Sequence, residues 1–509
     1  MNSWTSGYVA EIGYIHGFYR ELTPSLLHFV SLVRGQRAPD ANASLNYCEL
    51  ACGQGFSANL LAAANPQIQF FATDFNPAHI FGARTLAAEA ATTNIHFFDQ
   101  SFAEFVDNGE LPSFDIISLH GVYSWVSEEN RRAIVEFIRR KLNPGGLVYI
   151  SYNTLPGWAA MMPLRQLLVE HAHRSAGPIG ARVQAALEFV STLKQANPNF
   201  FRAYPGVGAR LEKIKTQNRN YIAHEYFNRD WTPFYHSEVA KDLDNAKLTY
   251  LGSASILDNV DVVNLSSEQQ KSLADIDDPV LRETVRDFMV NQQFRRDVFI
   301  KGLVPYSMNE LQNSWADTRF CPTHRREDFA PKLSTVRGEV TLEAAPYSAV
   351  LGAFAEKPRT LRELTTDKAV AAMSWPRLRE VMTVLVGMGQ LQPALDVKND
   401  VQRSRRVKVF NAAVLRRAES VSELGALASP ITGGGVPLSR FMQLFLAAQI
   451  ARHEDPVSWA WDKMRKTGQR LRKDGKILES DQENKAYLGE MFEEYLNKHS
   501  PALQHLGVS

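Results

Sequence analysis

The sequence predicts an α/β fold in its N-terminal half: a doubly wound, largely parallel sheet of seven strands, followed by a mostly helical C-terminal region. Three observations predict the sheet. Short apolar runs of strand length alternate with helical patterns between residues 45 and 152. A Gly-x-Gly turn separates the first strand from the first helix, and an acidic residue ends the second strand about 20 residues further on.

The composition is typical of a globular protein with several domains. The 509 residues are 45% hydrophobic and 22% charged, with a formal net charge of +1. This balance argues against a disordered chain and against nucleic-acid binding through bulk charge. The N-terminus has no signal-peptide pattern, and no apolar run is long enough to span a membrane. We therefore expect a cytoplasmic protein, and the spacing of the three cysteines predicts neither a disulfide framework nor a metal site.

Residues 1–44 are predicted to form a helical cover over the glycine turn. Tyr8, Tyr14, His16 and Tyr19 lie there at helical spacing. Such residues either contact a ligand or pack against the neighbouring elements, and packing is the commoner outcome.

Residues 45–51 are predicted to form the first buried strand, and residues 56–64 the first helix. Between them lies the turn Gly53-Gln54-Gly55. Glycines there leave the backbone N–H groups and the positive end of the helix open to a small polar ligand. An ordinary tight turn is the alternative.

The second strand, residues 67–74, ends at Asp74, and Phe75 follows before a helix over residues 77–91. An acid at this separation from a glycine turn receives ribose hydroxyls in nucleotide-binding α/β folds. Its alternative role is to cap the helix. The agreement between Asp74 and the glycines favours a nucleoside ligand.

The third strand, residues 94–98, is followed by Asp99, Gln100 and, at the start of a short helix, Phe102. Asp99 can accept from an adenine amino group and Phe102 can cover the ring. Asp99 as a helix cap is the alternative. A fourth strand (residues 113–119) leads to His120, then a helix over 127–141, a turn at 143–146 and a fifth strand over 147–152.

Together these motifs resemble the class I S-adenosylmethionine-dependent methyltransferases. The resemblance rests on ELACGQG from Glu49 to Gly55, the acidic end at Asp74, and LNPGGLVYIS over residues 142–151. It narrows to bacterial methyltransferases with a methyltransferase regulatory domain, a group that includes the rickettsial protein lysine methyltransferases, which modify outer-membrane protein. The narrowing motifs are FDIISLHGVYSWVS, YISYNTLPGW, HEYFNRDWTPFYHSE and QFRRDVFIKG.

The resemblance implies that S-adenosyl-L-methionine is the cofactor. In that family the acid before the turn, here Glu49, organises the turn and the methionine end of the cofactor. The third glycine of a nicotinamide-type motif is replaced here by Ala58. The candidate cofactor-binding residues are Glu49, Gly53, Gln54, Gly55, Asp74, Phe75, Asp99, Gln100, Phe102 and His120.

The predicted domains follow from the change of pattern along the chain, except the regulatory segment, which the resemblance implies. The methyltransferase core spans residues 45–303, with a helical insertion at 156–247, a regulatory segment at 224–302, and two last strands at 248–256 and 294–300. A linker (304–337), a winged-helix-like domain (338–412) and a C-terminal helical domain (413–509) complete the chain.

The winged-helix pattern consists of three helical patches followed by strands at 390–393 and 406–410. It raises DNA contact through Arg377, Arg379 and residues 403–408 as one interpretation. The near-neutral chain favours protein contact or a scaffold role instead.

Methyl transfer requires an aligned acceptor lone pair and the exclusion of water. A lysine ammonium has no lone pair, so apolar and aromatic walls that favour its deprotonation suit such an acceptor. Tyr123, Trp125, Tyr152 and Trp158 follow the fourth and fifth strands and are the candidate acceptor-site aromatics, with cap packing as the alternative. Asn153 can orient the amine, and His120 either accepts a proton or bonds the cofactor.

The sequence leaves three functions in competition. The first is a protein lysine methyltransferase, whose substrate the resemblance suggests to be a surface or outer-membrane protein before export. The second is a small-molecule or saccharide O- or N-methyltransferase. The third is a regulatory protein that binds the cofactor without transfer. Nucleic acid is not an expected partner, and the oligomeric state stays open.

Overall fold

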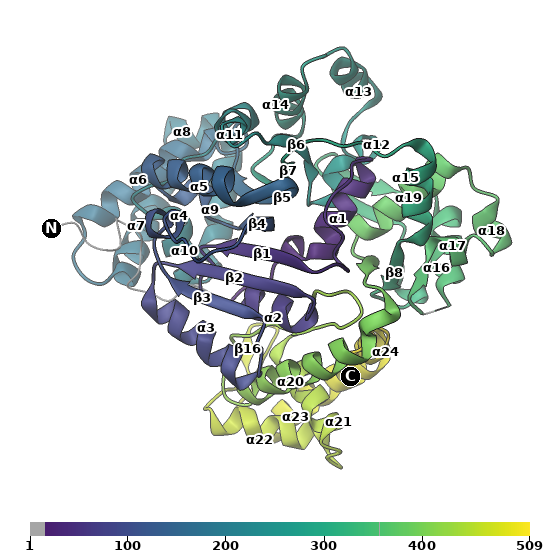
Figure 1. The fold of residues 1–509 in the computed structure, drawn as a ribbon. Helices are drawn as coiled ribbons and strands as arrows, with labels where there is room; N and C mark the ends of the chain where they lie inside the picture. The colour runs from purple at the N-terminus through teal and green to yellow at the C-terminus, as the bar shows by residue number, and fades with distance from the viewer. Residues whose placement is uncertain (1–15, 356, 509) are drawn as a thin grey trace.

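The computed structural model describes residues 16–355 and 357–508. Within them a seven-stranded sheet crosses the N-terminal half in the order β3-β2-β1-β4-β5-β7-β6 (Figure 1). The pairings of β7 with β5 and with β6 are antiparallel, and the other pairings in this sheet are parallel. The strands are β1 (Leu45–Leu50), β2 (Ile68–Asp74), β3 (Ile95–Asp99), β4 (Phe114–Leu119), β5 (Leu142–Asn153), β6 (Thr249–Ser253) and β7 (Phe294–Ile300). The predicted doubly wound sheet is confirmed, and its order reverses between β1 and β4, where such folds bind ligands.

Both faces of the sheet are covered, so its strands are apolar on both sides. Tyr47 and Tyr149 point to a core shared with α1 (Pro24–Val33) and α2 (Phe56–Ala64). Cys48 and Val148, one residue away, point to a second core with α4 (Phe102–Val106), α5 (Glu128–Lys141) and α11 (His236–Asp244). Helix α3 (Pro77–Glu89) packs beside α2 and β3.

The turn predicted at residues 143–146 is part of β5. This strand starts at Leu142, and its pairing with β4 shifts register between Phe114 and Ile116. The two glycines at 145 and 146 therefore occupy a bulged strand end rather than a separate turn.

The predicted helical insertion is present and has a core of its own. Its helices are α6 (Met162–Arg174), α7 (Ile179–Gln195), α8 (Asn199–Ala203), α9 (Pro205–Lys215) and α10 (Arg219–Tyr226). They lie at the side of the sheet to which the carboxyl end of β3 points (Figure 1). Between β6 and β7 the chain forms α12 (Asp261–Asn264), α13 (Ser267–Ala274) and α14 (Pro279–Val290).

The segment predicted as a linker, residues 304–337, is instead regular and packed. It contains α15 (Met308–Asp317), β8 (Arg319–Pro322) and β9 (Lys332–Thr335), which pairs with β10 (Gly338–Thr341). Trp315 and Cys321 are fully buried in the main core. The prediction was wrong here because β8, β9 and β10 are only four residues each, and because the prolines at 305, 322 and 331 outweighed the helical spacing of Met308, Leu311 and Trp315 in α15.

The winged-helix pattern is only partly correct. The helices α16 (Ala344–Phe354), α17 (Leu361–Leu364), α18 (Lys368–Ala371) and α19 (Trp375–Gly387) accompany a sheet of β11 (Arg359–Thr360), β8 and β12 (Leu391–Ala394). The second expected strand, residues 406–410, is wrong: it lies in α20 (Asp400–Ala418). Val407, Phe410 and Val414 of that helix are buried at helical spacing.

The arginines considered for DNA contact make bonds within the chain. Arg377 pairs with Glu343 and Glu380. Arg403 is 1% exposed and donates to the carbonyl of Pro430. These two side chains are therefore not free for a phosphate backbone.

The C-terminal region packs back against the beginning of the chain. Helix α20 contacts α2, and the loop at residues 433–435 is seated on the N-terminal segment (Figure 1). A Cβ at Gly435 would lie 2.8 Å from Cε1 of Phe18. The remaining elements are β13 (Ala426–Ala428), β14 (Gly435–Pro437), α21 (Arg440–Ile450), α22 (Pro456–Lys466), β15 (Arg472–Lys473), β16 (Lys476–Ile477), α23 (Asp481–Glu494) and α24 (Ser500–His505).

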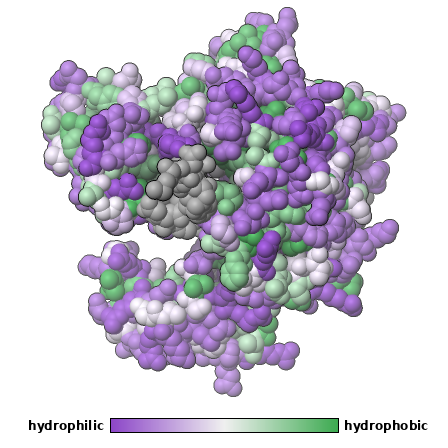
Figure 2. Space-filling model, turned by 60° about the vertical axis from the view of Figure 1, so that its left-hand side comes forward, coloured by the Kyte–Doolittle hydropathy of each residue, from purple (hydrophilic) through white to green (hydrophobic). Residues whose placement is uncertain are grey.

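The face of the molecule in Figure 2 is mostly hydrophilic, with hydrophobic residues in small groups. Among the helices of the described residues, none is both long and apolar enough to cross a membrane.

Candidate functional site

A cavity lies at the carboxyl ends of β1, β2, β3 and β4, where the strand order reverses. We call it the first cavity. The predicted residues that line it are Glu49, Gly53, Gln54, Asp74, Phe75, Gln100, Phe102, His120 and Trp125. Tyr19 of the N-terminal segment also lines it. The sheet thus brings together residues from four separate strand ends.

Both glycines of the turn adopt a backbone conformation that favours glycine. Gly53 and Gly55 have φ angles of 54° and 65°, in the left-handed region. Gly55 has a further reason to be glycine, because a Cβ there would lie 2.5 Å from Cβ of Ala83 and 2.9 Å from Cε1 of Phe97. Gly55 therefore permits the close packing of α2 on α3 and β3, whereas Gly53 lines the first cavity.

Asp74 fastens the turn to the end of β2. Its Oδ2 accepts from the backbone N–H of Gly53 at 3.0 Å, and its Oδ1 accepts from that of Asn76 at 2.9 Å. His79 Nδ1 lies 3.2 Å from the same Oδ1. A carboxylate offers about four acceptor positions. These contacts leave at least one for a ligand hydroxyl.

Glu49 is a buried carboxyl in the wall of the first cavity. It is 6% exposed, and its Oε2 makes no hydrogen bond with any of the described residues. Burial, together with the nearby charge of Asp74, raises the pKa of Glu49 to about 8. An unpaired buried carboxylate is costly, so this position favours a cationic ligand group.

A second cavity adjoins the first. Tyr19, His120, Gly121 and Trp125 line both of them. The other walls of the second cavity come from β5, from the insertion and from β7. The predicted residues Asn153 and Trp158 are among them, with Arg210, Tyr221, His224, Glu225, Asn228, Gln293, Phe294 and Arg296.

His120 stands at the junction of the two cavities as a neutral side chain. Its ring stacks on Tyr19 with centroids 3.7 Å apart, and its Nδ1 lies 2.7 Å from the hydroxyl of Tyr149. Burial, and then the charge of Arg296, lowers the pKa of His120 to about 3. Such a weak base is a poor proton acceptor at neutral pH, which favours the hydrogen-bonding alternative for this residue.

Two of the predicted acceptor-site aromatics lie elsewhere in the structure. Tyr123 is fully buried and donates to Oδ2 of Asp242 at 2.7 Å. Tyr152 is fully buried and donates to Oδ2 of Asp297 at 2.6 Å. Neither tyrosine is among the residues described as lining either cavity. The prediction for these two residues is therefore corrected: they are structural.

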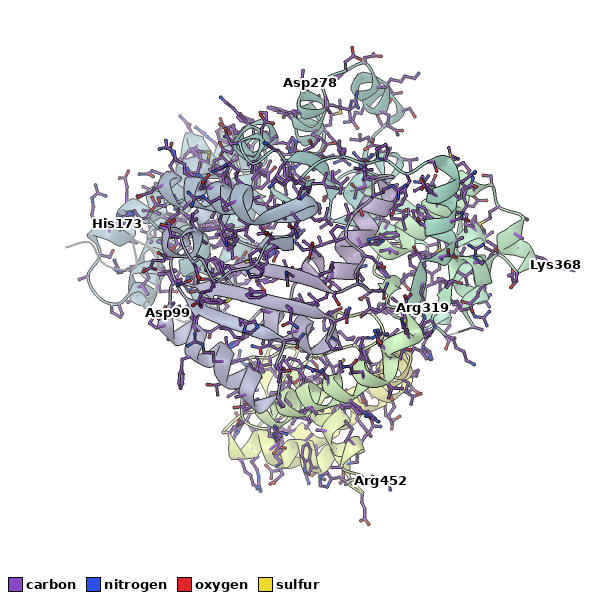
Figure 3. All side chains as sticks on the ribbon, in the orientation of Figure 1. Asp99, His173, Asp278, Arg319, Lys368 and Arg452 are labelled. Carbon is purple, nitrogen blue, oxygen red and sulfur yellow. The ribbon has the colours of Figure 1, made fainter. Side chains whose placement is uncertain are left out.

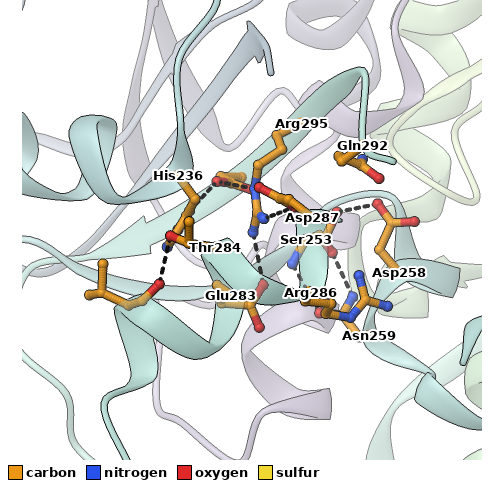
Figure 4. Close-up of polar contacts among 12 residues, drawn as sticks. His236, Ser253, Asp258, Asn259, Glu283, Thr284, Arg286, Asp287, Gln292 and Arg295 are labelled. Atoms are coloured by element: carbon orange, nitrogen blue, oxygen red, sulfur yellow. Dashed lines mark hydrogen bonds and ion pairs between the residues drawn. The ribbon is translucent and has the colours of Figure 1, made fainter. Parts of the chain in front are cut away.

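The partner of Tyr152 belongs to a buried polar cluster between β7, α11 and α14. Arg295 stands at its centre and pairs with Asp297, Asp287 and Glu283 (Figure 4). His236 Nδ1 lies 3.2 Å from Oδ2 of Asp297. The hydroxyl of Tyr152 donates to Asp297 within this network of buried charged groups, so it is not available to a substrate.

Asp99 is also not where the prediction requires it. Its side chain is exposed at the end of β3 (Figure 3) and is not among the described lining of the first cavity. The residues that follow it, Gln100 and Phe102, do line the cavity. The adenine contact expected of Asp99 is therefore better suited to Gln100.

Family models match two parts of this arrangement. Residues 48–148, which carry the first cavity, match the family described as a methyltransferase domain. Residues 218–301 match the family described as a predicted methyltransferase regulatory domain. An uncharacterized protein of Synechocystis sp. is 42% identical over 507 residues, covering 100% of both chains.

The chain belongs to the class I S-adenosylmethionine-dependent methyltransferases with a regulatory domain. An uncharacterized protein of Rickettsia prowazekii is 28% identical and covers 78% of the methyltransferase and 74% of that relative. The solved structure of PKMT2 from Rickettsia typhi in complex with AdoHcy has the same fold, with a TM-score of 0.67 and 19% identity over 96% of the methyltransferase and 99% of that chain.

The first cavity fits the family's cofactor. S-adenosylmethionine has an α-ammonium, two ribose hydroxyls and an adenine ring. The unpaired Glu49 carboxyl suits the ammonium, the remaining acceptor position of Asp74 suits a hydroxyl, and Phe75 and Phe102 offer aromatic surface. These individual roles stay proposals.

Sequence reasoning missed the contribution of the insertion and β7 to the second cavity. Glu225, Arg210 and Tyr221 are far from the glycine turn in sequence and carry no spacing signal. Glu225 lies within the quoted motif HEYFNRDWTPFYHSE, which pointed to the family and not to a role for this residue.

Proposed function

We propose that this methyltransferase transfers the methyl group to a protein lysine amine, with the cofactor in the first cavity and the acceptor side chain in the second. The observation that carries the proposal is the shared wall. Tyr19, His120 and Trp125 line both cavities, so a methyl group presented at the junction faces an acceptor in the second cavity.

The lining of the second cavity suits an amine. Glu225 provides a carboxyl group, and Trp125 provides an aromatic ring that attracts a cation. The rings of Trp158, Phe294 and Tyr19 also line the cavity, but each has Arg210, Arg296 or His120 over one face. The neighbouring structure from Rickettsia typhi is that of PKMT2, and this name agrees with a protein methyltransferase. A protein substrate is therefore the partner that this proposal requires.

When bound, the cofactor supplies an electrophilic methyl on a sulfonium. The chain's own residues then have to hold the acceptor in line and keep water out. His120 is neutral and stacked on Tyr19, so it shapes the junction rather than taking a proton. Asn153, which is 2% exposed, can orient the amine through its side-chain amide.

The test is incubation of the full chain with radiolabelled S-adenosylmethionine and a bacterial lysate. The expected result is acid-stable label in protein bands, released as methylated lysine on hydrolysis. Asp74→Ala serves as the negative control. Label only in the small-molecule fraction would support a small-molecule or saccharide methyltransferase instead, and binding of the cofactor with no label anywhere would support a regulatory role.

A further inference from the structure

The segment matched by the regulatory-domain model builds the acceptor side of the site. Half of the residues that line the second cavity lie between residues 218 and 301. They come from α10 with the turn after it, and from β7. The first cavity, in contrast, is built mainly from residues 48–148. The division between the two family models thus follows the division between the two cavities.

Glu225 is the carboxyl group that α10 contributes to the second cavity. The helix is fixed there because the indole N–H of Trp125 donates to the carbonyl of Glu225 at 3.4 Å. Trp125 itself lines both cavities. The Glu225 side chain therefore lies in the cavity next to the wall that the cofactor cavity shares.

Asn153 lies beside this carboxyl with unused bonding capacity. It is 2% exposed, and its Nδ2 makes no hydrogen bond of normal geometry within residues 16–355 and 357–508. A buried amide donor without a partner is rare and costs stability unless a ligand completes it. A carbonyl oxygen of the acceptor would complete it, and the amine's lone pair stays free for the methyl group.

The environment of Glu225 suits proton transfer. Burial raises the pKa of Glu225 to about 7, against the lowering effects of the Arg210 guanidinium, the Asn153 amide and Arg165. The other titratable or charged groups that line the cavity are Tyr19, His120, Tyr221 and His224 of α10, and Arg296 of β7. Arg296 is paired with Glu21, whereas Arg210 lies over the ring of Trp158 at 4.1 Å and donates to Gln293.

We propose that Glu225 binds the acceptor's ammonium group in the second cavity and takes the proton that the amine must lose, while Asn153 positions the amine. The inference rests on the proposed lysine acceptor. It makes the so-called regulatory segment the acceptor-binding half of the catalytic site.

The proton balance is as follows. The lysine N–H bond breaks, its proton passes to the Glu225 carboxylate, and the neutral amine keeps the lone pair. That lone pair forms the N–CH₃ bond as the S–CH₃ bond breaks, and the sulfonium becomes a neutral thioether. The product is a methylammonium ion, and Glu225 releases its proton to solvent before the next turnover.

The need for such a group follows from the acceptor's own pKa. A lysine amine has a pKa near 10.4, so at pH 7 roughly one molecule in 2,500 is neutral. A carboxylate that pairs with the ammonium lets the enzyme use the abundant form. His120 cannot replace it, because its pKa is too low.

The experiment compares pH profiles of kcat/KM for wild type and Glu225→Gln, with radiolabelled S-adenosylmethionine and poly-L-lysine. Wild type should rise to a plateau above about pH 7, because a carboxylate and an ammonium must meet. Glu225→Gln can use only neutral amine, so its kcat/KM should rise about tenfold per pH unit up to about pH 10. The ratio of the wild-type kcat/KM to that of Glu225→Gln should therefore be about a hundredfold smaller at pH 10 than at pH 8.

Glu212→Gln is the matched control, since Glu212 is an exposed carboxylate on the neighbouring helix α9 that pairs with Lys194 and Lys215. Its profile should follow wild type. Affinity for S-adenosylhomocysteine, measured by calorimetry, should be unchanged in Glu225→Gln and reports an intact fold. Parallel profiles of wild type and Glu225→Gln would overturn the inference.

A second measurement does not depend on turnover. Propylammonium chloride should bind the S-adenosylhomocysteine complex of wild type at least fivefold more tightly than that of Glu225→Gln. Equal affinities, or no binding to wild type, would overturn the inference. If wild type binds propylammonium but labels only hydroxyl acceptors, the lysine proposal fails while the ammonium site of Glu225 stands.

Discussion

Binding of the cofactor should release a proton from Glu49, and this can be measured directly. In the empty cavity burial and Asp74 raise the pKa of Glu49 to about 8. At pH 6.5 the group is therefore almost wholly protonated. Pairing with the ligand's α-ammonium favours the carboxylate by about 1.5–3 kcal/mol, which lowers the pKa of Glu49 by about 1–2 units, so binding of S-adenosylhomocysteine should release roughly 0.3–0.8 proton at this pH.

The expected effect on affinity is small at low pH and larger at high pH. Ionising Glu49 at pH 6.5 costs about 2 kcal/mol, since it lies about 1.5 units below the pKa. A charge-assisted bond to the ammonium returns about 1.5–3 kcal/mol. Glu49→Gln should therefore change the dissociation constant less than about fivefold at pH 6.5 and by about 10- to 100-fold at pH 8.5.

The assay is calorimetry in buffers of different ionisation enthalpy, which gives the number of protons released. Wild type should release roughly 0.3–0.8 proton at pH 6.5 and Glu49→Gln almost none. The reasoning is refuted if the variant releases the same proton, or if wild type releases none although the variant loses affinity. In the latter case Glu49 would be ionised in the empty cavity.

The same shift predicts the stability of the empty protein. The pKa of Glu49 is raised in the folded state, so its favourable contribution is present below about pH 4.5 and lost as the pH rises through 8. Glu49→Gln has no group to ionise at this position, so it does not lose this stability as the pH rises. Its melting temperature should exceed that of wild type at pH 8, with a difference in unfolding free energy on the order of 4 kcal/mol, and should match it near pH 4.5.

Three further predictions follow from the packing. Gly55→Ala should destabilise the fold by about 2–4 kcal/mol in urea unfolding, because its Cβ would overlap Ala83 and Phe97 at a positive φ. Its control, Gly82→Ala in the interior of α3, should stabilise the fold by about 0.5–1 kcal/mol. Equal effects of the two substitutions would contradict the packing role of Gly55. Tyr152→Phe should lower stability by about 1–2 kcal/mol and leave kcat unchanged, and a large fall in kcat would restore the catalytic role first expected of it. Gly435→Ala should weaken S-adenosylhomocysteine binding severalfold, because its Cβ would displace Phe18 and with it the adjacent Gly17 and Tyr19, which line the first cavity. Gly425→Ala, whose Cβ enters open space, should leave binding unchanged. Unchanged binding in Gly435→Ala would show that the C-terminal region does not support this wall of the cavity.

The sequence determined the local parts of the site. A strand, a glycine turn and a helix follow one another within about twenty residues, so residue spacing predicted the positions of Gly53 and Asp74, whereas the role of Glu49 came from the family resemblance. The carboxyl ends of parallel strands meet at one edge, and this brought Gln100, Phe102 and His120 to the same cavity. These predictions depend only on local patterns and on a regular sheet topology.

Only the tertiary structure decided which neighbours of those residues face a ligand. Tyr152 and Asn153 are adjacent, but successive side chains on a strand point to opposite faces, so one joins the Arg295 cluster and the other lines the second cavity. Glu225 lies more than seventy residues beyond Asn153 in the sequence, and it lines the same cavity because α10 packs against Trp125. No periodicity in the sequence encodes such a contact, because it results from how separately formed elements pack together.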